Sequence, residues 1–529
     1  MLFLRLRWLA PVLGFFAGFS FCLAESSAGI RLYLAPQTLR SDEATLIWEK
    51  LEGADPGLAY EVLRDGQPVG ETTKTHFTAR ELAPEQAYVF MVRVPGAAGT
   101  GNPGVRTQSN PLELRTLSPE PVVSVLDHGA VGDGRTLNTR ALQAAIDACP
   151  PGGVVRLPAG VFLSGALFLR SDMTLEIAEG GVLKGSADPA DYAPFIRNRF
   201  EGWEMDTYAS LLNAGTLDSA GPANVRNLSI RGAGTISGGG KKLSDAVRAE
   251  FPGVKGLRSR GRLILLMNAE NVEVAGLTLE ETPCWTLHYI YSENITLRGL
   301  VIRSDVRNGD GIDPDSSRSS YIFDCTFDTG DDCIAIKSGK NPEGNVIKRP
   351  TEIVRVFDCR FDRGHGISIG SEISGGVRDV LIEDCVAGPL LHGLQIKATE
   401  ERGGFVENVK VRDCSLRQIT VYTKLPYNND GGAAPIPPIF RDFRFENIDL
   451  TEADPTKPVI VVNGFAAEGH RTRNVSFGNI RLPAGAKVTV DRAEDVTFVR
   501  TTTSEGGEPL YEITRSERVK HRARRIDLR

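Results

Sequence analysis

The sequence predicts an all-β protein in which a small β-sandwich precedes a right-handed parallel β-helix. Glycine (56 residues) and proline (30 residues) are abundant, and no long stretch has the i, i+3, i+4, i+7 apolar spacing of helices. Short segments with one apolar and Asx register recur in the second half of the chain, among them LRGLVI, FDCTF, FDCRF and ENIDL. A length of 529 residues suits two domains or one elongated repeat array.

The first 24 residues predict a cleaved signal peptide. Arg5 and Arg7 precede an apolar run from Trp8 to Phe21, and Cys22-Leu23-Ala24 follows with the small residues of a cleavage site. A membrane anchor is the alternative, but the run is shorter than the roughly 20 residues that a spanning helix needs. We therefore expect a secreted or periplasmic protein without a membrane span.

Residues 25–117 resemble a fibronectin type III domain. Short runs alternate apolar and polar residues, Trp48 lies in one of them, and the string from Leu82 to Tyr88 has the pattern Leu-x-Pro-x-x-x-Tyr. In such sandwiches this tyrosine ties a strand crossing and a tryptophan fills the core. Both residues are expected to serve packing.

Residues 118–514 are expected to form the β-helix. It begins after the proline-containing linker Ser118–Pro121. One amphipathic helix, from about Thr139 to Cys149, should cover the open end of the strand stack. Residues 515–529 are basic and lack apolar periodicity, which predicts a separate tail that is disordered or caps the solenoid.

Equivalent positions of the repeat are separated by 23 to 34 residues, a length that suits one coil of a β-solenoid. These positions are Leu277, Leu300, Cys325, Cys359, Cys385, Cys414, Ile448 and Ile480. Because equivalent positions of neighbouring coils stack, the cysteines should form a buried ladder, in which free thiols are favoured over disulfides. Three glycosylation-type sequences begin at Asn227, Asn294 and Asn474, but they share one register, which fits turns better.

The formal net charge is −6 and the isoelectric point is near 5.8, which argues against a surface for nucleic acid. No cysteine spacing resembles a zinc site, so neither a metal nor a cofactor is expected. The oligomeric state leaves no signal in the sequence.

Four polar motifs occur in successive coils. They are Asn308–Asp313 (NGDGID), Thr329–Cys333 (TGDDC), Gly364–Ser371 (GHGISIGS) and Gln395–Lys397 (QIK). Because stacked strands lie about 4.8 Å apart, residues at matching positions of adjacent coils become neighbours. We expect the acidic residues to converge on one face.

Hydrolysis of a glycosidic bond needs one protonated carboxyl and one carboxylate that activates water. Asp310, Asp331 and Asp332 are crowded, so they cannot all ionise easily, and one of them should serve as the acid. Aspartates at coil bends also cap turns or bind structural cations. We prefer that interpretation for Asp305, Asp315, Asp324 and Asp328.

The order and spacing of NGDGID, TGDDC, GHG and the final Ile-Lys resemble those of glycoside hydrolase family 28, the polygalacturonase family, from about Val122 to the last coils. The resemblance implies that Asp331 is the acid and that Asp310 and Asp332 activate water. It implies that His365 supports the protonation of the acid and the reacting sugar.

The same resemblance implies that Lys397 holds a uronate carboxylate and that Asn308 orients the first motif. One position departs from it, because Gln395 stands where the family pattern Arg-Ile-Lys has arginine, so a neutral amide replaces a charged contact. Galacturonan is the expected substrate. A decorated pectin, either rhamnogalacturonan or xylogalacturonan, is the alternative.

Other residues near the motifs are candidates for binding an anionic polymer. Lys337 and Arg262 could line subsites, and Trp203 could stack on a sugar ring; Lys340, Arg402 and Trp285 are weaker candidates for the same roles. The sandwich-like domain and the insertion at residues 198–204 resemble the exo-acting bacterial branch of the family. Extra loops of this kind could close one end of a cleft, which would admit only a chain terminus.

Two rival functions share this fold. A pectate lyase would need calcium and a basic residue that abstracts the C5 proton, and no arginine or lysine beside the acid cluster is expected to serve as that base. A non-catalytic carbohydrate-binding solenoid would keep the aspartates for structure, but the presence of Asp331, Asp332 and His365 together speaks against it. The expected partners are pectin, polygalacturonate or galacturonate oligosaccharides.

Overall fold

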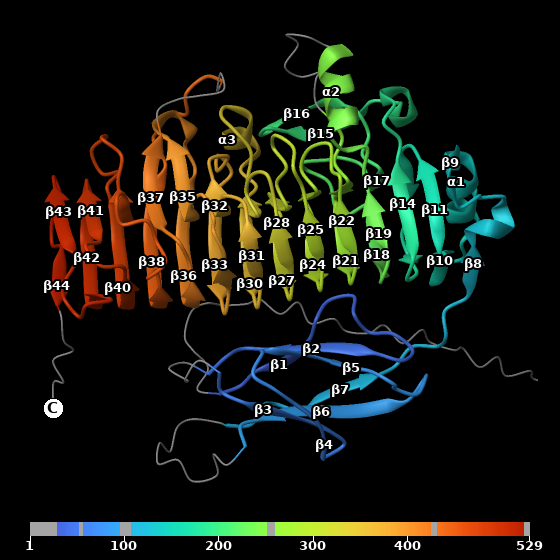
Figure 1. Cartoon of the computed structure of the whole chain (residues 1–529), viewed down its shortest axis with the longest axis horizontal. Coiled ribbons are helices and arrows are strands. Elements are labelled where there is room, and N and C mark those ends of the chain that lie inside the picture. The colour runs from blue at the N-terminus through green and yellow to red at the C-terminus, as the bar shows by residue number, and fades with distance from the viewer. Residues whose placement is uncertain (1–28, 52–56, 96–106, 251–259, 425–430, 523–529) are drawn as a thin grey trace, which may run out of the picture.

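The computed structural model describes residues 29–51, 57–95, 107–250, 260–424 and 431–522, so the signal peptide expected at residues 1–24 lies outside the described residues. A small sandwich lies against one long side of an extended solenoid, and the N-terminal coils are at one end and the C-terminal coils at the other (Figure 1). The predicted combination of a parallel β-helix and a small sandwich is confirmed. Among the described residues, no helix is long and apolar enough to cross a membrane.

The sandwich consists of two antiparallel sheets. One has the order β1-β2-β5, with β1 (Leu32–Leu34), β2 (Ala44–Trp48) and β5 (His76–Ala79); the other has the order β4-β3-β6-β7, with β3 (Tyr60–Arg64), β4 (Gln67–Thr72), β6 (Ala87–Arg93) and β7 (Leu112–Arg115). Trp48 is fully buried between them, with its ring edge-on to Tyr60 at 5.5 Å. The Tyr88 hydroxyl accepts a hydrogen bond from the amide of Ala83 at 2.9 Å, which is the strand tie that the sequence predicted.

The solenoid is built from two parallel sheets. The twelve-stranded sheet contains β12 (Leu167–Leu169), β17 (Leu212–Ala214), β20 (Ile264–Met267), β23 (Leu287–Ile290), β26 (Ile312–Asp315), β29 (Ile334–Ile336), β32 (Gly366–Gly370), β35 (Gly393–Thr399), β37 (Ile419–Lys424), β39 (Pro458–Asn463), β41 (Lys487–Asp491) and β43 (Leu510–Thr514). Each strand pairs in parallel with the equivalent strand of the next coil, so a row of outward side chains runs along the solenoid axis.

The remaining solenoid strands form one sheet of 23 strands, in which most coils contribute two short strands and the last full coils one long strand. The short strands are β8 (Val122–Ser124), β9 (Asp133–Leu137), β10 (Gly153–Leu157), β11 (Gly160–Ser164), β13 (Met173–Ile177), β14 (Gly181–Gly185), β18 (Val225–Gly232), β19 (Thr235–Ser237), β21 (Ala269–Ala275), β22 (Thr278–Glu280), β24 (Glu293–Arg298), β25 (Val301–Arg303), β27 (Arg318–Phe323), β28 (Thr326–Asp328), β30 (Thr351–Phe357), β31 (Arg360–Arg363), β33 (Val377–Glu383), β34 (Val386–Ala387) and β44 (Lys520–Arg522). The long strands are β36 (Phe405–Ser415), β38 (Ile439–Asp449), β40 (Thr472–Leu482) and β42 (Ala493–Thr503).

Other elements lie at the ends and edges of the solenoid. They are the helices α1 (Thr139–Ala148), α2 (Gly240–Glu250) and α3 (Glu343–Ile347), the 3₁₀ turns η1 (Val125–His128), η2 (Pro189–Tyr192) and η3 (Glu400–Arg402), and the antiparallel hairpin β15 (Ile196–Phe200) and β16 (Trp203–Thr207). The helix expected to cover the open end is α1, whose side chains Leu142, Ala145 and Ile146 are buried against the first coil. This prediction is confirmed to within one residue.

The stacked ladders expected from the repeat are present. Cys325, Cys359, Cys385 and Cys414 occupy equivalent positions of successive coils, and all seven cysteines of the described residues are free and buried. Cys333 does not belong to this ladder, because it lies just before β29, where its sulfur contacts the hydroxyl of Thr329 at 3.4 Å. Burial raises the pKa values of the Cys359, Cys385 and Cys414 thiols well above the ordinary value, which makes them unreactive.

Asparagine stacking explains the shared register of the glycosylation-type sequences. Asn227, Asn271 and Asn294 all have positive φ, near 55°, and their amides bond to one another in sequence at 3.2 and 3.1 Å. Asn474 has the same conformation and donates to Asp442 at 2.6 Å. Asparagine tolerates this left-handed backbone better than most residues, so the repeat uses it at a turn.

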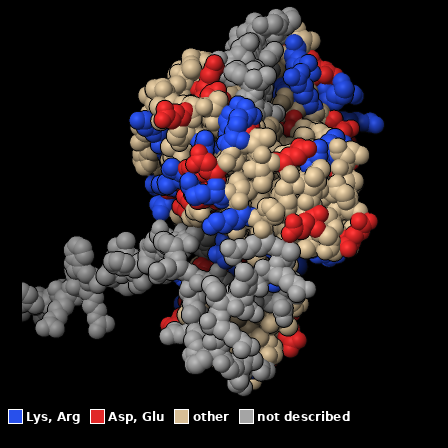
Figure 2. Space-filling view, turned by 90° about the vertical axis from the view of Figure 1, so that its left-hand side faces the viewer, with Lys and Arg blue, Asp and Glu red and all other residues tan. Residues whose placement is uncertain are grey.

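The solenoid extends beyond the boundary expected at residue 515, which corrects the interpretation of the whole segment as a separate tail. β44 pairs in parallel with β42, while Arg515 and Arg518 bond to Asp491 and Asp495 of the preceding coil. The basic residues of this segment therefore neutralise carboxylates of the solenoid. Seen from the C-terminal end, basic and acidic side chains are interspersed on the surface (Figure 2).

The sandwich is fastened to the 23-stranded sheet by buried charges and an apolar patch. Arg40 forms an ion pair with Glu273, and both side chains are almost fully buried. Lys50 bridges Asp384 and Asp413 at 2.7 and 2.8 Å. The apolar patch contains Ala35, Ile47, Tyr321, Phe323 and Phe357.

We predict that Arg40→Ala lowers the thermal unfolding midpoint far more than Lys74→Ala does. Removing Arg40 takes one of two arginines from the buried Glu273 carboxylate and leaves it only Arg298, so the cost should approach that of a broken buried pair, about 3–5 kcal/mol. Lys74 pairs with Asp324 on the exposed edge of the same interface, where a pair contributes about 0–1 kcal/mol. Equal shifts of the midpoint in the two variants would contradict this account of the interface.

Candidate active site

The four polar motifs meet because each stands where a coil turns into the twelve-stranded sheet. Asp310 precedes β26, Asp331 and Asp332 precede β29, His365 precedes β32, and Lys397 lies within β35. The backbone ties these turns together, since the Gly311 amide donates to the Asp332 carbonyl at 3.0 Å and the His365 amide to the Asp331 carbonyl at 2.9 Å. The convergence of acids predicted from the sequence is therefore present.

Asp331 and His365 form a hydrogen-bonded pair. The His365 Nδ1 lies 3.0 Å from Asp331 Oδ1 and 3.7 Å from Asp332 Oδ1. The bonds to Asp331 and then to Asp332 raise the pKa of His365 to about 9. His365 is accordingly protonated at neutral pH, and the proton that it shares with Asp331 lies in a part of the site that remains about 30% exposed.

The glycines of the GHG motif make this position of His365 possible. Gly364 and Gly366 have φ of 130° and 93°, which other residues rarely adopt. A Cβ at Gly366 would lie 2.0 Å from the carbonyl oxygen of Gly393 on the next coil, and one at Gly364 would lie 2.3 Å from the hydroxyl of Thr329. The two glycines thus let the turn approach both neighbouring coils closely.

Asp332 is held as a carboxylate. Its Oδ1 accepts a hydrogen bond from Ser368 at 2.8 Å, and its Oδ2 lies 3.4 Å from Lys397 Nζ. Burial alone would raise the pKa of Asp332, but the charge of Lys397 and the bond from His365 outweigh it and hold the pKa below its ordinary value. A buried, ionised carboxylate suits a base that activates water.

The pKa of Asp310 is shifted in the opposite direction. Burial and the neighbouring Asp313 raise it well above the ordinary value, although Lys337 acts in the other direction. The proton of the three crowded aspartates was expected on Asp331. The shift favours the protonated form of Asp310 over that of Asp332, while Asp331 faces His365.

Lys337 was expected to bind substrate, and the structure places it inside the acid cluster. Its ammonium is buried beneath the acids, 3.3 Å from both Asp310 and Asp313 and 3.9 Å from Glu372, and it lies over the ring of Trp285 at 4.5 Å. Those carboxylates raise its pKa well above the ordinary value, even though burial acts to lower it. Lys337 is therefore a fixed internal cation of the acid cluster.

Asp313 is a site residue that the sequence analysis missed. Its side chain is fully buried next to Lys337, and burial raises its pKa to about 7 despite that cation. Asp313, Ala335, Ser368 and Gln395 occupy matching positions of successive strands. The period of two within NGDGIDPD, with Asp313 and Asp315 on one face of β26, was the signal that could have identified it.

Arg262 was also expected to contact substrate, and the structure places it in the interior. It is 1% exposed, between the rings of Phe200 and Trp285 at 5.1 and 4.9 Å, and it donates to Asn198 at 3.0 Å. Its role is to anchor the β15–β16 hairpin. The contact of the Arg262 guanidinium with the two aromatic rings explains why a charged side chain is tolerated in the interior.

Two other predicted residues, Trp203 and Asn308, have defined partners. Trp203 stands at the hairpin turn, donates from Nε1 to the Asn341 carbonyl at 3.2 Å, and has Lys340 over its ring at 4.7 Å. Asn308 accepts a hydrogen bond from Arg260 at 3.0 Å, which holds the turn before Asp310. Of the weaker candidates, Lys340, Arg402 and Trp285 are all almost fully buried.

Gln395 and Lys397 lie on the same strand, one coil beyond His365. Gln395 is 2% exposed, and its side-chain oxygen accepts a hydrogen bond from the Tyr422 hydroxyl at 3.3 Å. Lys397 is partly exposed and paired with Asp332. The neutral amide of Gln395 therefore lies on the same strand as the ammonium of Lys397, which is expected to contact the substrate.

Asp331, Asp332 and His365 are the one group of three acidic or histidine side chains in the described residues with ligand atoms close enough to hold a metal ion, all within 4.8 Å. The geometry favours proton transfer, since Nδ1 of His365 points its proton at Asp331 and the Lys397 ammonium lies against Asp332. A cation would have to displace both interactions.

Comparison with known proteins agrees with this geometry. The model of the family described as Glycosyl hydrolases family 28 matches residues 200–503. An exo-poly-alpha-D-galacturonosidase of Dickeya chrysanthemi is 29% identical over 462 residues, which cover 79% of this chain and 76% of the relative. An endo-polygalacturonase of Pectobacterium carotovorum is 29% identical over 373 residues, 65% of this chain and 84% of the relative. The structure of the family 28 exopolygalacturonase of Yersinia enterocolitica superimposes with a TM-score of 0.84 at 27% identity and covers 92% of this chain and 98% of that one.

We predict that the His365 imidazole titrates near pH 9 and that Asp331→Asn moves its pKa down toward the ordinary value of about 6.5. Because the pKa is raised in the folded state, the stabilisation by the pair is complete below about pH 6.5 and is lost as the pH rises through about 9. NMR titration of the imidazole signals measures the shift. Asp305→Asn, at an exposed position one coil before Asp331, is the control and should leave the His365 midpoint unchanged; a wild-type midpoint near 6.5 would contradict the proposed pair.

Proposed function

The chain belongs to glycoside hydrolase family 28, and we propose on this premise that it hydrolyses α-1,4-linked galacturonan with inversion at the anomeric carbon, acting from a chain end. The observation that supports this most strongly is the juxtaposition of the protonated His365–Asp331 pair with the ionised Asp332. One side supplies a proton and the other a base, which are the two requirements of inverting hydrolysis.

Asp331 is proposed as the acid that protonates the departing glycosidic oxygen. It is the more exposed member of the adjacent pair and faces a protonated imidazole 3.0 Å away, so its proton can be replaced from His365. Burying Asp331 under a sugar would raise its affinity for that proton, since desolvation disfavours the carboxylate. His365 then becomes the reservoir that sets the acid for the next turnover.

Asp332 is proposed to take the proton of the attacking water. Ser368 and Lys397 hold its two oxygens, so the carboxylate is fixed in orientation as well as ionised. Asp310 assists at the other side of the water. Lys337, which lies 3.3 Å from both Asp310 and Asp313, is the cation that favours the ionised form of Asp310.

Substrate recognition is proposed to rest on Lys397, with Asn308 and Gln395 acting through the loops and strands that they hold. Lys397 is the partly exposed ammonium at the acid cluster and would attract a uronate carboxylate. A lyase requires a free base in this place. No lysine or arginine base was expected beside the acids; Lys337 lies there, but its raised pKa keeps it protonated and unfit for that task.

Action from a chain end is supported by the β15–β16 hairpin, which crosses the outer side of the twelve-stranded sheet. Arg199 of β15 bonds to Asp315 on β26 at 2.7 Å, and the Lys340 amide after β29 donates to the Gly202 carbonyl at 2.9 Å. The hairpin therefore connects loops that precede strands of the twelve-stranded sheet with loops that follow such strands. A polymer lying along the row of turns could not continue past it.

The composition of residues 1–24 supports export, and we propose a secreted or periplasmic location, where galacturonan would be encountered.

We predict that Asp331→Asn lowers kcat on polygalacturonate by about 100-fold or more, since general acids contribute roughly 10²–10⁴-fold. The amide keeps the shape of the side chain, so calorimetric binding of trigalacturonate should remain measurable. The control is Asp328→Asn, which changes an exposed aspartate of the same coil that pairs with Arg363. Near wild-type turnover by Asp331→Asn would remove Asp331 from the acid role.

A time course on polygalacturonate is expected to release only mono- or disaccharide from the start. Chromatography of early digests measures product length, and proton NMR of the same samples should detect the anomer opposite to that of the substrate linkage. A broad ladder of oligomers would contradict action from a chain end. Release of a retained anomer would contradict inversion, and an unsaturated product absorbing in the ultraviolet would indicate a lyase.

A further inference from the structure

A groove continues the row of catalytic turns toward the C-terminal coils. It has a volume of about 280 Å³ and is formed by the three turns that enter β35, β37 and β39. Its lining residues are Pro389, Leu390, Leu391, His392, Arg417, Gln418, Glu452, Asp454, Lys457, Pro458 and Val459. Turns in the same position of the three preceding coils contain Asp310, the Asp331–Asp332 pair and His365.

The groove is continuous with the active site. The ring of His392 packs edge-on against that of His365, with 5.5 Å between centroids. Coils are about 4.8 Å apart, so the groove begins one coil beyond His365 and extends over two more. A polymer that ends at the hairpin and is cut at Asp331 must leave in this direction.

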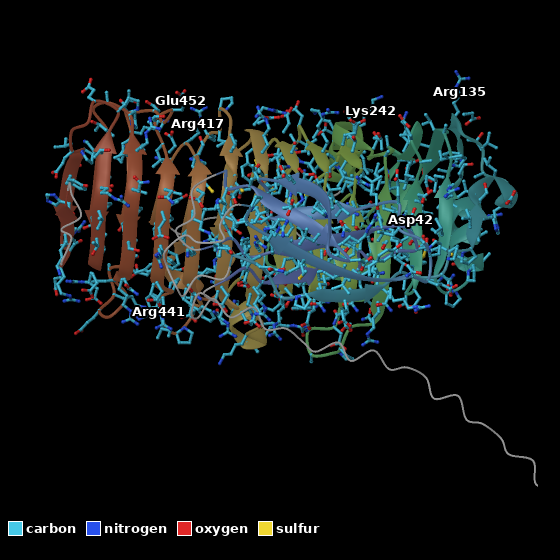
Figure 3. All side chains as sticks on the ribbon, turned by 90° about the horizontal axis from the view of Figure 1, so that it is seen from below. Asp42, Arg135, Lys242, Arg417, Arg441 and Glu452 are labelled. Carbon is cyan, nitrogen blue, oxygen red and sulfur yellow. The ribbon has the colours of Figure 1, made fainter. Side chains whose placement is uncertain are left out.

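The charges of the groove balance. Arg417 lies 3.6 Å from Glu452, and Lys457 lies 3.9 Å from Asp454. Figure 3 shows Arg417 and Glu452 side by side along one edge of the solenoid, with Arg441 at the opposite edge. The guanidinium of Arg417 is further occupied by the carbonyl oxygens of Gly388 and Glu452, at 2.6 and 2.5 Å.

This arrangement does not suit a uronate carboxylate. Both cations are matched by acids, and the Glu452 and Asp454 side chains are 76% and 54% exposed, so their carboxylates face an incoming anion. Apart from His392 and Gln418, the remaining wall is apolar and includes Leu391, which is 61% exposed. An uncharged sugar ring, with one apolar face and hydroxyls at its rim, meets these surfaces without an unpaired charge.

We propose that this groove is a distal subsite for an uncharged sugar unit of the polymer, either a methyl-esterified galacturonate or a neutral sugar branch. The inference rests on the proposed function. Esterified or branched sugar units are then accepted in the departing part of the substrate. The sugar at the acids remains a uronate whose carboxylate contacts Lys397. Gln395, which stands between the two regions in place of a cation, fits the same decline in positive charge along the row.

The test compares kcat/KM for purified oligogalacturonides that differ only in the units beyond the cleavage point. Wild-type protein should process an oligomer that is esterified or neutrally branched there at least as well as the unesterified one. If only the esterified arm is accepted, the occupant is the methyl ester; if only the branched arm is accepted, it is the neutral sugar. A clear preference for the unesterified oligomer would overturn the proposal.

The charge argument predicts the direction of two variants. Glu452→Lys should shift the preference toward the unesterified oligomer by up to about fivefold, the effect of one exposed charge interaction, and Glu452→Gln by less. The matched control is Glu517→Lys, because Glu517 is an exposed glutamate paired with arginine on the last coil, away from the groove. Equal shifts in Glu452→Lys and Glu517→Lys would overturn the assignment to this groove.

Digalacturonate separates the two levels of inference, because it is too short to reach beyond the sugars at the cleaved bond. If the product is the monosaccharide, turnover of digalacturonate should be the same in wild type, Glu452→Lys and Glu517→Lys; if the product is the disaccharide, trigalacturonate is the shortest substrate and takes its place in this comparison. If digalacturonate and polygalacturonate are both left intact by wild-type protein, the proposed function itself fails. If both are hydrolysed but Glu452→Lys does not alter the preference among longer oligomers, only the groove proposal fails.

Discussion

Parallel pairing between successive coils is the constraint on which the rest of the structure depends. Because each strand of the twelve-stranded sheet pairs with its equivalent in the next coil, the turns that enter these strands form a row with one fixed spacing. Acids that are 21 residues apart in sequence, Asp310 and Asp331, become neighbours only through this pairing. The same register aligns the cysteine and asparagine ladders, so catalytic and packing residues are positioned by one backbone pattern.

The crowding that follows from this register sets the protonation of the site. Asp310 and Asp332 are both buried, yet their pKa values move in opposite directions. Asp310 faces Asp313 and shares its cation with other acids, whereas Asp332 has Lys397, His365 and Ser368 around its oxygens. The difference therefore comes from the partners, since burial acts on both carboxyls in the same sense.

The fold and the convergence of the catalytic residues could be predicted, because both follow from the repeat spacing of the sequence. The burial of individual side chains could not be predicted from that spacing. Arg262 and Lys337 were expected at the surface because isolated cations usually are exposed, but aromatic rings and carboxylates from other coils surround them. Asp313 was missed for a related reason. A buried acid needs a charged partner, and the partner of Asp313 is Lys337, which follows 24 residues later in the chain and is not recognisable as its partner from the sequence. Cys333 lies in the repeat region without belonging to the ladder, so repeat spacing alone does not show which cysteines stack.

The two ends of the site differ in what they offer a polymer. On the N-terminal side, the hairpin covers the sheet and is held by Arg199, which bonds to Asp315, and by Arg262, which bonds to Asn198. On the C-terminal side, the row of turns stays open and changes from the charged pair of Asp332 and Lys397 to the balanced groove next to His392. A uronate is therefore attracted most strongly where it is cut, and the attraction weakens along the path of the departing chain. This gradient would let the enzyme release the long product and bind the new chain end, because tight binding of every unit would stabilise the product complex as much as the transition state.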